Sequence, residues 1–193
     1  MKTISKWMIF LLVAIAQFMV VLDNAITNVA LPSIKTELGF STETLQWVVT
    51  AYALAFGGFL LLGGRIADLY GRRNALLGGM AAFTLFSFLI GVSQEPWQLI
   101  VLRAFQGLSG AFMSPAALSI VLVTFRDGDA RNKALSYWTL VSTGGAAAGL
   151  LLGGLLTQYF GWRWNFLVNV PIGIIVGILI ARYIPAHAKE EKE

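Results

Sequence analysis

Two ionisable side chains lie deep inside long apolar stretches of the sequence, Asp23 in the first stretch and Arg103 in the fourth. A lone charge in membrane hydrocarbon costs about 2.5–3.5 kcal/mol, so such residues usually pair or face a water-filled path. Counted from Pro32 and Pro96, they lie about 13 Å and about 10 Å below the same end of their helices, at about 1.5 Å per residue. We therefore expect the two side chains to pair, or to face one cavity.

Polar and small residues extend both positions into stripes along their helices. At about 100° per residue, one side of the first helix carries Asp23, Asn24, Thr27 and Asn28. The stripe on the fourth helix consists of Arg103, Gln106, Gly107, Gly110 and Ser114. The stripes are either a purely structural ion pair with small residues for packing, or an ion or proton site on a substrate path. In the second interpretation the cavity-lining candidates are Asn24, Thr27, Asn28, Gln106, Gly107 and Gly110.

The composition is that of a membrane protein. Of 193 residues, 57% are hydrophobic and 12% are charged, whereas soluble domains carry about 25% charged residues. The apolar stretches predict six transmembrane helices, at about residues 7–29, 45–62, 75–92, 97–124, 134–159 and 165–184. We expect one all-α membrane domain over residues 1–193, ending in a charged tail at residues 189–193.

The charged residues favour one orientation and exclude several kinds of site. Most lysines and arginines fall in the segments that would share one side with the two termini, which predicts that both termini are cytoplasmic. This placement explains the net charge of +4 better than a nucleic-acid partner does. The absence of cysteine excludes disulfides and thiolate sites. We expect no metal site and no enzyme, because no paired carboxylates lie within the membrane stretches.

One short polar segment separates the second and third stretches and reads Gly64-x-x-x-Asp68-x-x-Gly71-Arg72-Arg73. Gly64 and Gly71 could supply the positive φ angles of a tight turn. Its arginines would mark the cytoplasmic side, and Asp68 could cap a helix or pair with a guanidinium. An ordinary positively charged loop is the simpler interpretation.

Five motifs together carry a resemblance to a known family. The segment around Asp68 resembles the signature between spans 2 and 3 of the major facilitator superfamily. Four others resemble signatures of its fourteen-spanning drug:proton antiporters of the EmrB/QacA type. These are Leu22-Asp23-x-x-Ile26-x-Asn28-Val29-Ala30-Leu31-Pro32, Leu99-x-x-x-Arg103-x-x-Gln106-Gly107-x-Ser109-Gly110-Ala111, Gly145-x-x-x-Gly149-x-x-x-Gly153-Gly154 and Trp162-Arg163-Trp164-x-Phe166-x-x-Asn169-x-Pro171-x-Gly173.

The resemblance implies a bundle of two inverted three-helix repeats, which is half of a two-bundle transporter in the plasma (inner) membrane. Such a transporter would export lipophilic or cationic small molecules by alternating access, with a proton gradient as energy source and no cofactor. Its partners would be the lipid bilayer, the substrate and a second six-helix bundle, either a C-terminal half or a homodimer partner. Asp23 would carry the proton or meet a cationic substrate, and Arg103 would tune the pKa of Asp23.

The resemblance also assigns roles to the turn and to the glycines. The turn would act as a conformational switch through Gly64, Asp68, Gly71, Arg72 and Arg73. The fifth helix would use Gly145, Gly149, Gly153 and Gly154 for gating, although close helix packing explains such spacing equally well. Leu150 replaces the proline of the family pattern, and Leu69 stands where many members have a basic residue. The alternative function is a truncated, non-transporting half that assembles with or modulates another membrane protein.

Overall fold

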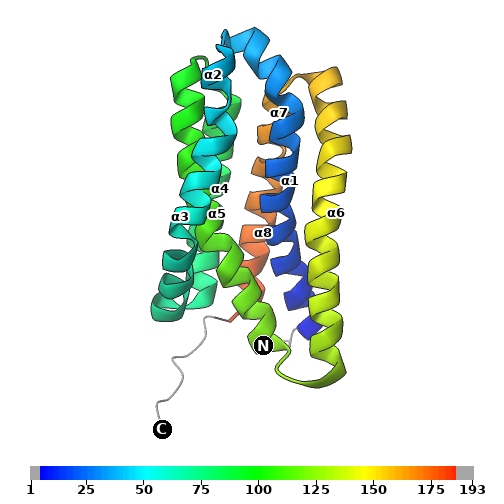
Figure 1. The fold of residues 1–193 in the computed structure, drawn as a ribbon. Coiled ribbons are helices and arrows are strands. Elements are labelled where there is room, and N and C mark those ends of the chain that lie inside the picture. Colours follow the sequence, from blue (N-terminus) through cyan, green and yellow to red (C-terminus); the bar gives the residue numbers. More distant parts are fainter. Residues whose placement is uncertain (1–4, 186–193) are drawn as a thin grey trace.

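The computed structural model describes residues 5–185, and every regular element in this range is an α-helix (Figure 1). Six helical segments are long and apolar enough to cross a membrane. The predicted all-α, six-helix membrane fold is therefore confirmed. The predicted charged tail at residues 189–193 lies outside the described residues.

The helices run alternately between the two ends of one bundle (Figure 1). In chain order they are α1 (Lys6–Leu38), α2 (Thr42–Leu45), α3 (Trp47–Tyr70), α4 (Arg72–Gly91), α5 (Pro96–Thr124), α6 (Gly128–Phe160), α7 (Arg163–Leu167) and α8 (Asn169–Tyr183). The short helices α2 and α7 precede α3 and α8, respectively. We call the end at which α3 meets α4 the Gly71 end, and the opposite end, where α1 finishes, the Gly39 end.

The first helix is longer than the sequence predicted. It continues through Pro32 to Leu38, so much of the expected loop over residues 33–44 is helical. Gly39, with φ of 70°, ends it. A proline inside a helix removes one backbone hydrogen bond. Here the extra turns are held by packing, because Ile34 is completely buried in an apolar cluster at the Gly39 end.

The glycine- and arginine-rich segment is almost entirely helical. α3 runs to Tyr70 and α4 begins at Arg72, so Gly71 alone, with φ of 96°, makes the turn. The prediction that Gly64 adopts a positive φ is wrong, because Gly64 lies inside α3. A single residue therefore joins these two membrane-spanning helices.

Two other predicted loops are partly helical, and one helix passes a proline. α6 begins at Gly128, inside the expected loop over residues 126–133, and α7 begins within the expected turn over residues 161–164. Pro115 lies within α5, which is one continuous helix. The loops that remain are short, so each helix is fixed close to its neighbours in the sequence.

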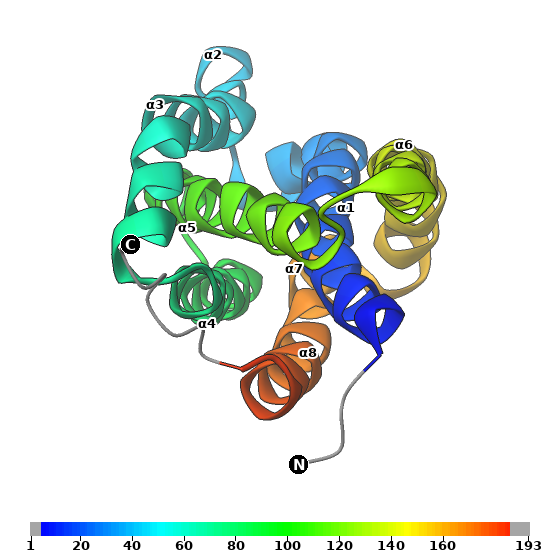
Figure 2. The same ribbon diagram turned by 90° about the horizontal axis from the view of Figure 1, so that it is seen from below.

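The helices form a layered bundle when it is viewed along its axis. Figure 2 shows α1 and α5 in the middle, α3 and α6 toward one side, and α4 and α8 toward the other. α3 and α4 pack on α5, while α6 and α8 pack on α1. The two sets of contacts are equivalent if α1, α3 and α4 form one three-helix repeat and α5, α6 and α8 form the other. In each repeat the second and third helices then pack on the first helix of the other repeat. α3 and α6 are the least buried spans.

Candidate functional site

Asp23 and Arg103 are in contact at the centre of the bundle. Arg103 Nη1 donates to Asp23 Oδ2 at 2.6 Å, and both side chains are completely buried. The guanidinium also donates through Nε to the Val48 carbonyl of α3 at 3.1 Å. It lies 4.2 Å from the centre of the Tyr52 ring, within the range of a cation–π interaction. The structure thus brings together the two charges that the sequence singled out.

Neutral polar side chains complete the surroundings of the ion pair. Gln106 Nε2 and Asn169 Nδ2 donate to Asp23 Oδ1 at 2.9 and 2.8 Å. Gln106 also accepts from Arg103 Nη1 at 2.6 Å and donates to Ser87 Oγ at 2.8 Å. We call these residues the polar core: Asp23, Ser87, Arg103, Gln106 and Asn169. They come from α1, α4, α5 and α8. The Asp23 carboxylate accepts directly from α5 and α8, and Ser87 of α4 is connected to it through Gln106.

The sequence predictions did not include three of the groups around the ion pair, Tyr52, Ser87 and Asn169. Asn169 was noted only as part of a motif at the start of the sixth stretch. The available signal was its amide, a polar group inside an apolar stretch. Among residues 5–185, no group of three or more histidine, cysteine or acidic side chains is placed to hold a metal ion.

The six cavity-lining candidates separate into two sets. Asn24 and Asn28 are exposed and line a groove of about 440 Å³. The other four, Thr27, Gln106, Gly107 and Gly110, are buried. The groove lies between α1, α3 and α6, and we call it the amide groove. Its polar walls are Gln17, Asn24 and Asn28 of α1, and its aromatic wall is Tyr52 and Phe56 of α3.

The two buried glycines of α5 allow close approach of α3. A Cβ on Gly107 would collide with the backbone carbonyl of Tyr52, and one on Gly110 would lie 3.1 Å from the Tyr52 hydroxyl. These glycines therefore hold Tyr52 against α5, where its ring covers Arg103. They affect the site through helix packing, and they do not line the amide groove themselves.

The predicted switch residues lie around the turn at Gly71. Arg72 Nε is 4.0 Å from Asp68 Oδ1, a weak pair because most of the Asp68 side chain is exposed. Arg73 Nη2 donates to the Ala181 carbonyl near the end of α8. Gly64 lies one turn before Asp68 and approaches only the Pro115 side chain, at 3.8 Å for an added Cβ. The turn is thus tied to α8 through Arg73.

The four glycines predicted on the fifth span do not share one environment. An added Cβ would lie 3.2 Å from Phe18 and Val21 at Gly145, 2.5 Å from Ala25 at Gly149, and 2.9 Å from Ile26 at Gly153. All of these neighbours belong to α1. Nothing lies within 4 Å of the same position at Gly154. Three of the four glycines therefore form the contact between α6 and α1.

The sequence of the chain decides its family. Residues 13–193 match the description of the Major Facilitator Superfamily. The chain belongs to the Major Facilitator Superfamily. This membership confirms the resemblance inferred from the motifs, and the superfamily is one of membrane transporters and not of enzymes.

Two superfamily relatives illustrate the sequence similarity. The puromycin resistance protein pur8 of Streptomyces alboniger is 46% identical over 180 residues, which cover 93% of this chain and 36% of that protein. The cephamycin export protein CmcT of Amycolatopsis lactamdurans is 45% identical over 188 residues, covering 97% of this chain and 39% of that protein. The chain thus spans less than half the length of the relatives that it matches.

Solved superfamily structures share the fold at low sequence identity. A bacterial homologue of the human lysosomal transporter Spinster, in an inward-facing and unoccupied conformation, aligns with a TM-score of 0.78 and 18% identity. The alignment covers 97% of this chain and 45% of that one. The xylose transporter XylE from E. coli, in an inward-open conformation, gives 0.77 and 15%, covering 94% and 49%. The six-helix arrangement is therefore that of about half of such a transporter.

Proposed function

We propose that the chain is one of the two six-helix bundles of a proton-coupled exporter of lipophilic compounds. The observation that carries this proposal is the position of the polar core directly behind the amide groove. Asp23 belongs to the polar core, while Asn24 and Asn28 on the same helix line the groove. Any change at the Asp23 carboxylate therefore acts on the helix that forms the substrate wall.

In the proposed mechanism Asp23 carries the proton and does not contact the substrate. Its carboxylate is completely buried and already accepts from Arg103, Gln106 and Asn169. Protonation would remove the negative charge that opposes the guanidinium, so the contact between α1 and α5 would weaken. The groove would change shape with the protonation state, which is the coupling that exchange of a proton for a substrate requires.

The substrate would occupy the amide groove, with its far side covered by a second bundle. The groove combines two aromatic rings with three neutral amides, a composition suited to lipophilic molecules that carry hydrogen-bonding groups. α3 and α6 flank it and are the least buried spans, which supports a second bundle on this side. The pur8 and CmcT relatives are described as resistance and export proteins for antibiotics, which favours a compound of that kind.

The proposed orientation places the Gly71 end in the cytoplasm and the protein in the plasma membrane. Six basic residues lie in the helix ends and the turn at this end: Arg65, Arg72, Arg73, Arg126, Arg131 and Lys133. The Gly39 end comprises residues 31–50, residues 91–97 and α7. Its basic residues are Lys35 and Arg163, and Arg163 pairs with Glu37. The excess of positive charge at one end supports this orientation.

The proposal is tested with purified protein in proteoliposomes. Asp23→Asn should abolish uptake of a fluorescent lipophilic dye driven by a pH gradient, while expression stays unchanged. Asp129→Asn, a change at an exposed acid in the first turn of α6, is the matched control and should transport normally. Normal pH-driven transport by the Asp23→Asn protein would exclude Asp23 as the proton carrier.

The assembly is tested by light scattering coupled to size exclusion in mild detergent. A dimer would support a transporter built from two copies, and the vesicle assay would use that dimer. A monomer would call for co-expression with the part of CmcT that lies outside the matched region. If neither assembly moves dye down a pH gradient, the alternative of a non-transporting half that modulates another membrane protein is favoured.

A further inference from the structure

A second groove lies on the side of the bundle opposite the amide groove. It has a volume of about 570 Å³ and runs between α4 and α8. Figure 2 shows these two helices on the side away from α3 and α6. The proposed second bundle would cover α3 and α6, so this groove would face the surrounding bilayer. We call it the outer groove.

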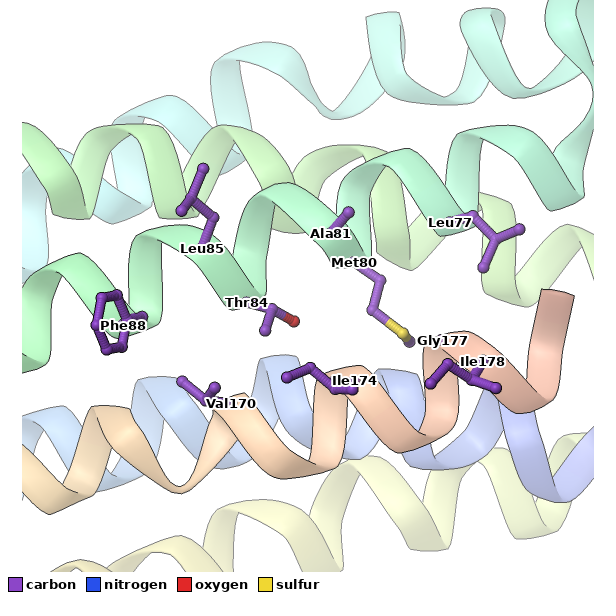
Figure 3. Close-up of a pocket in the computed structure, with 11 residues that line it drawn as sticks. Leu77, Met80, Ala81, Thr84, Leu85, Phe88, Val170, Ile174, Gly177 and Ile178 are labelled. Atoms are coloured by element: carbon purple, nitrogen blue, oxygen red, sulfur yellow. The ribbon is translucent and has the colours of Figure 1, made fainter.

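The floor of the outer groove is made by glycines of α8. Thr84 and Met80 project from α4 toward this helix (Figure 3). A Cβ on Gly173 would collide with the Thr84 side chain, and one on Gly177 would lie 3.5 Å from Met80 Sδ. The two helices therefore approach closely along one line. Larger side chains border that line on both sides, and the space between them is the open channel of the outer groove.

The walls of the outer groove follow one stripe on each helix. On α4 the stripe is Leu77, Ala81 and Leu85, and on α8 it is Val170, Ile174 and Ile178. In both stripes the residues are four apart, so they share a helix face. Leu85, Ile174 and Ile178 are each more than half exposed in the isolated bundle, and in a bilayer such surface contacts lipid chains.

Each stripe ends in an arginine at the Gly71 end. Arg73 lies four residues before Leu77, and Arg182 lies four residues after Ile178, about 6 Å farther along the helix in each case. Arg73 donates to the carbonyl of Ala181, so the two helices are joined there, and its side chain lines a separate pocket with Ile120 and Ile184. Arg182 is exposed and its guanidinium lies 5.9 Å from the ring centre of Tyr183. Tyrosine rings favour the headgroup level of a membrane.

We propose that the outer groove binds one acyl chain of an anionic phospholipid whose phosphate lies at Arg182. The apolar channel from Phe88 to Leu77 is about 16 Å long, at about 1.5 Å per residue. The hydrocarbon of one leaflet is about half of 30 Å, so one chain fills the channel. The exposed positive charge of Arg182 beyond its end complements a phosphate, whereas a zwitterionic headgroup also brings a positive charge. The site rests on the proposed assembly, in which a second bundle covers α3 and α6, and not on proton-coupled export.

The test is native mass spectrometry of the purified 193-residue chain in mild detergent, with phosphatidylglycerol or phosphatidylcholine of identical chains. We expect one phosphatidylglycerol to bind at lower concentration than phosphatidylcholine. A phosphatidylglycerol with a diazirine in its acyl chain should crosslink to peptides of α4 and α8. One arginine near the membrane surface contributes enough attraction for Arg182→Gln to weaken binding about fivefold.

Two matched pairs of variants separate the headgroup from the acyl chain. Arg182→Gln removes the charge at the groove, and Arg126→Gln removes an exposed charge at the same end of the bundle. Ala81→Phe fills the channel at an exposed position, and Ile175→Phe places the same ring on α8 at a position that does not line the groove. Arg182→Gln and Ala81→Phe should reduce crosslinking, and the two controls should not.

Three results would overturn the proposal. Equal binding of both lipids, unchanged by Arg182→Gln, would show that no phosphate is recognised. Full crosslinking in the Ala81→Phe protein would show that the chain lies elsewhere. A dimer whose interface protects α4 and α8 from the diazirine would show that a second copy occupies the groove. Circular dichroism of each variant confirms that it is folded, so a loss of lipid is assigned to the site.

Discussion

Two ion pairs connect α1 to later parts of the chain, and they differ in almost every other respect. Asp23 and Arg103 are completely buried, form hydrogen bonds with α3 and α8, and are connected to α4 through Gln106. Glu37 and Arg163 pair at the Gly39 end, with 52% and 30% of their side chains exposed. Here Arg163 also donates to the Ser93 carbonyl and stacks on Trp162.

The comparison shows that surroundings, and not the contact itself, set the importance of an ion pair. Water can replace either partner of the exposed pair, and such pairs contribute about 0–1 kcal/mol. In the polar core no water competes, so the loss of one partner leaves a charge in an apolar interior. We therefore expect the buried pair to contribute much more to the free energy of unfolding than the exposed pair.

The largest expected effect comes from breaking the buried pair on one side. Arg103→Met leaves the Asp23 carboxylate without its cation and should lower the free energy of unfolding by about 3–5 kcal/mol. Thermal unfolding in detergent, followed by tryptophan fluorescence, measures this. The double variant Asp23→Asn/Arg103→Met should recover part of the loss, because neither charge remains. A double variant no more stable than Arg103→Met would contradict the explanation by an uncompensated charge.

A smaller effect should follow from moving α1, which carries one member of each pair. Gly153→Ala would place a Cβ 2.9 Å from Ile26 Cα, so α6 and α1 must separate. Overpacking of this kind costs about 1–3 kcal/mol. Gly154→Ala is the matched control, because nothing lies within 4 Å of its Cβ position. Thermal unfolding should therefore distinguish two neighbouring glycines, and equal melting temperatures would argue against close packing at Gly153.

The smallest effect is expected at the exposed pair. Glu37→Gln removes the charge but keeps an oxygen that can accept from Trp162 Nε1, a bond that Glu37 now makes at 2.9 Å. The loss should stay below about 1 kcal/mol and should shrink further in high salt. Melting temperatures measured at low and high salt test both statements. A loss as large as that of Arg103→Met would invalidate the contrast between the two pairs.

The pairing of Asp23 with Arg103 could be expected from the sequence because the depth of each residue depends only on its own helix. Depth along a helix follows from a constant rise per residue, and both Asp23 and Arg103 could be counted from a proline, although α1 continues past Pro32. The family motifs and the six spans were predicted from equally local patterns of apolar residues, glycines and charges. These are the features of the fold that a sequence determines most directly.

The remaining parts of the site depend on how the helices are rotated against one another. Counting residues placed Asp23 and Asn24 in one stripe, yet the first is buried and the second is exposed on the amide groove. Likewise Gly154 follows Gly153 but faces away from α1. Asn169 meets Asp23 because α8 packs beside α1. Helix rotation is set by tertiary packing, which periodicity alone does not contain.

The separation of the polar core along the chain has a consequence for biogenesis. The partners of Asp23 follow it by 80 residues at Arg103, 83 at Gln106 and 146 at Asn169. At about 5–20 residues per second, a ribosome needs about 4–16 s to reach the first partner and about 7–30 s to reach the last. During this interval α1 enters the membrane with an acid that has no counter-charge. The apolar residues of α1 must therefore offset the cost of inserting Asp23 without help from its partners. The polar core is complete only after the sixth span has been inserted.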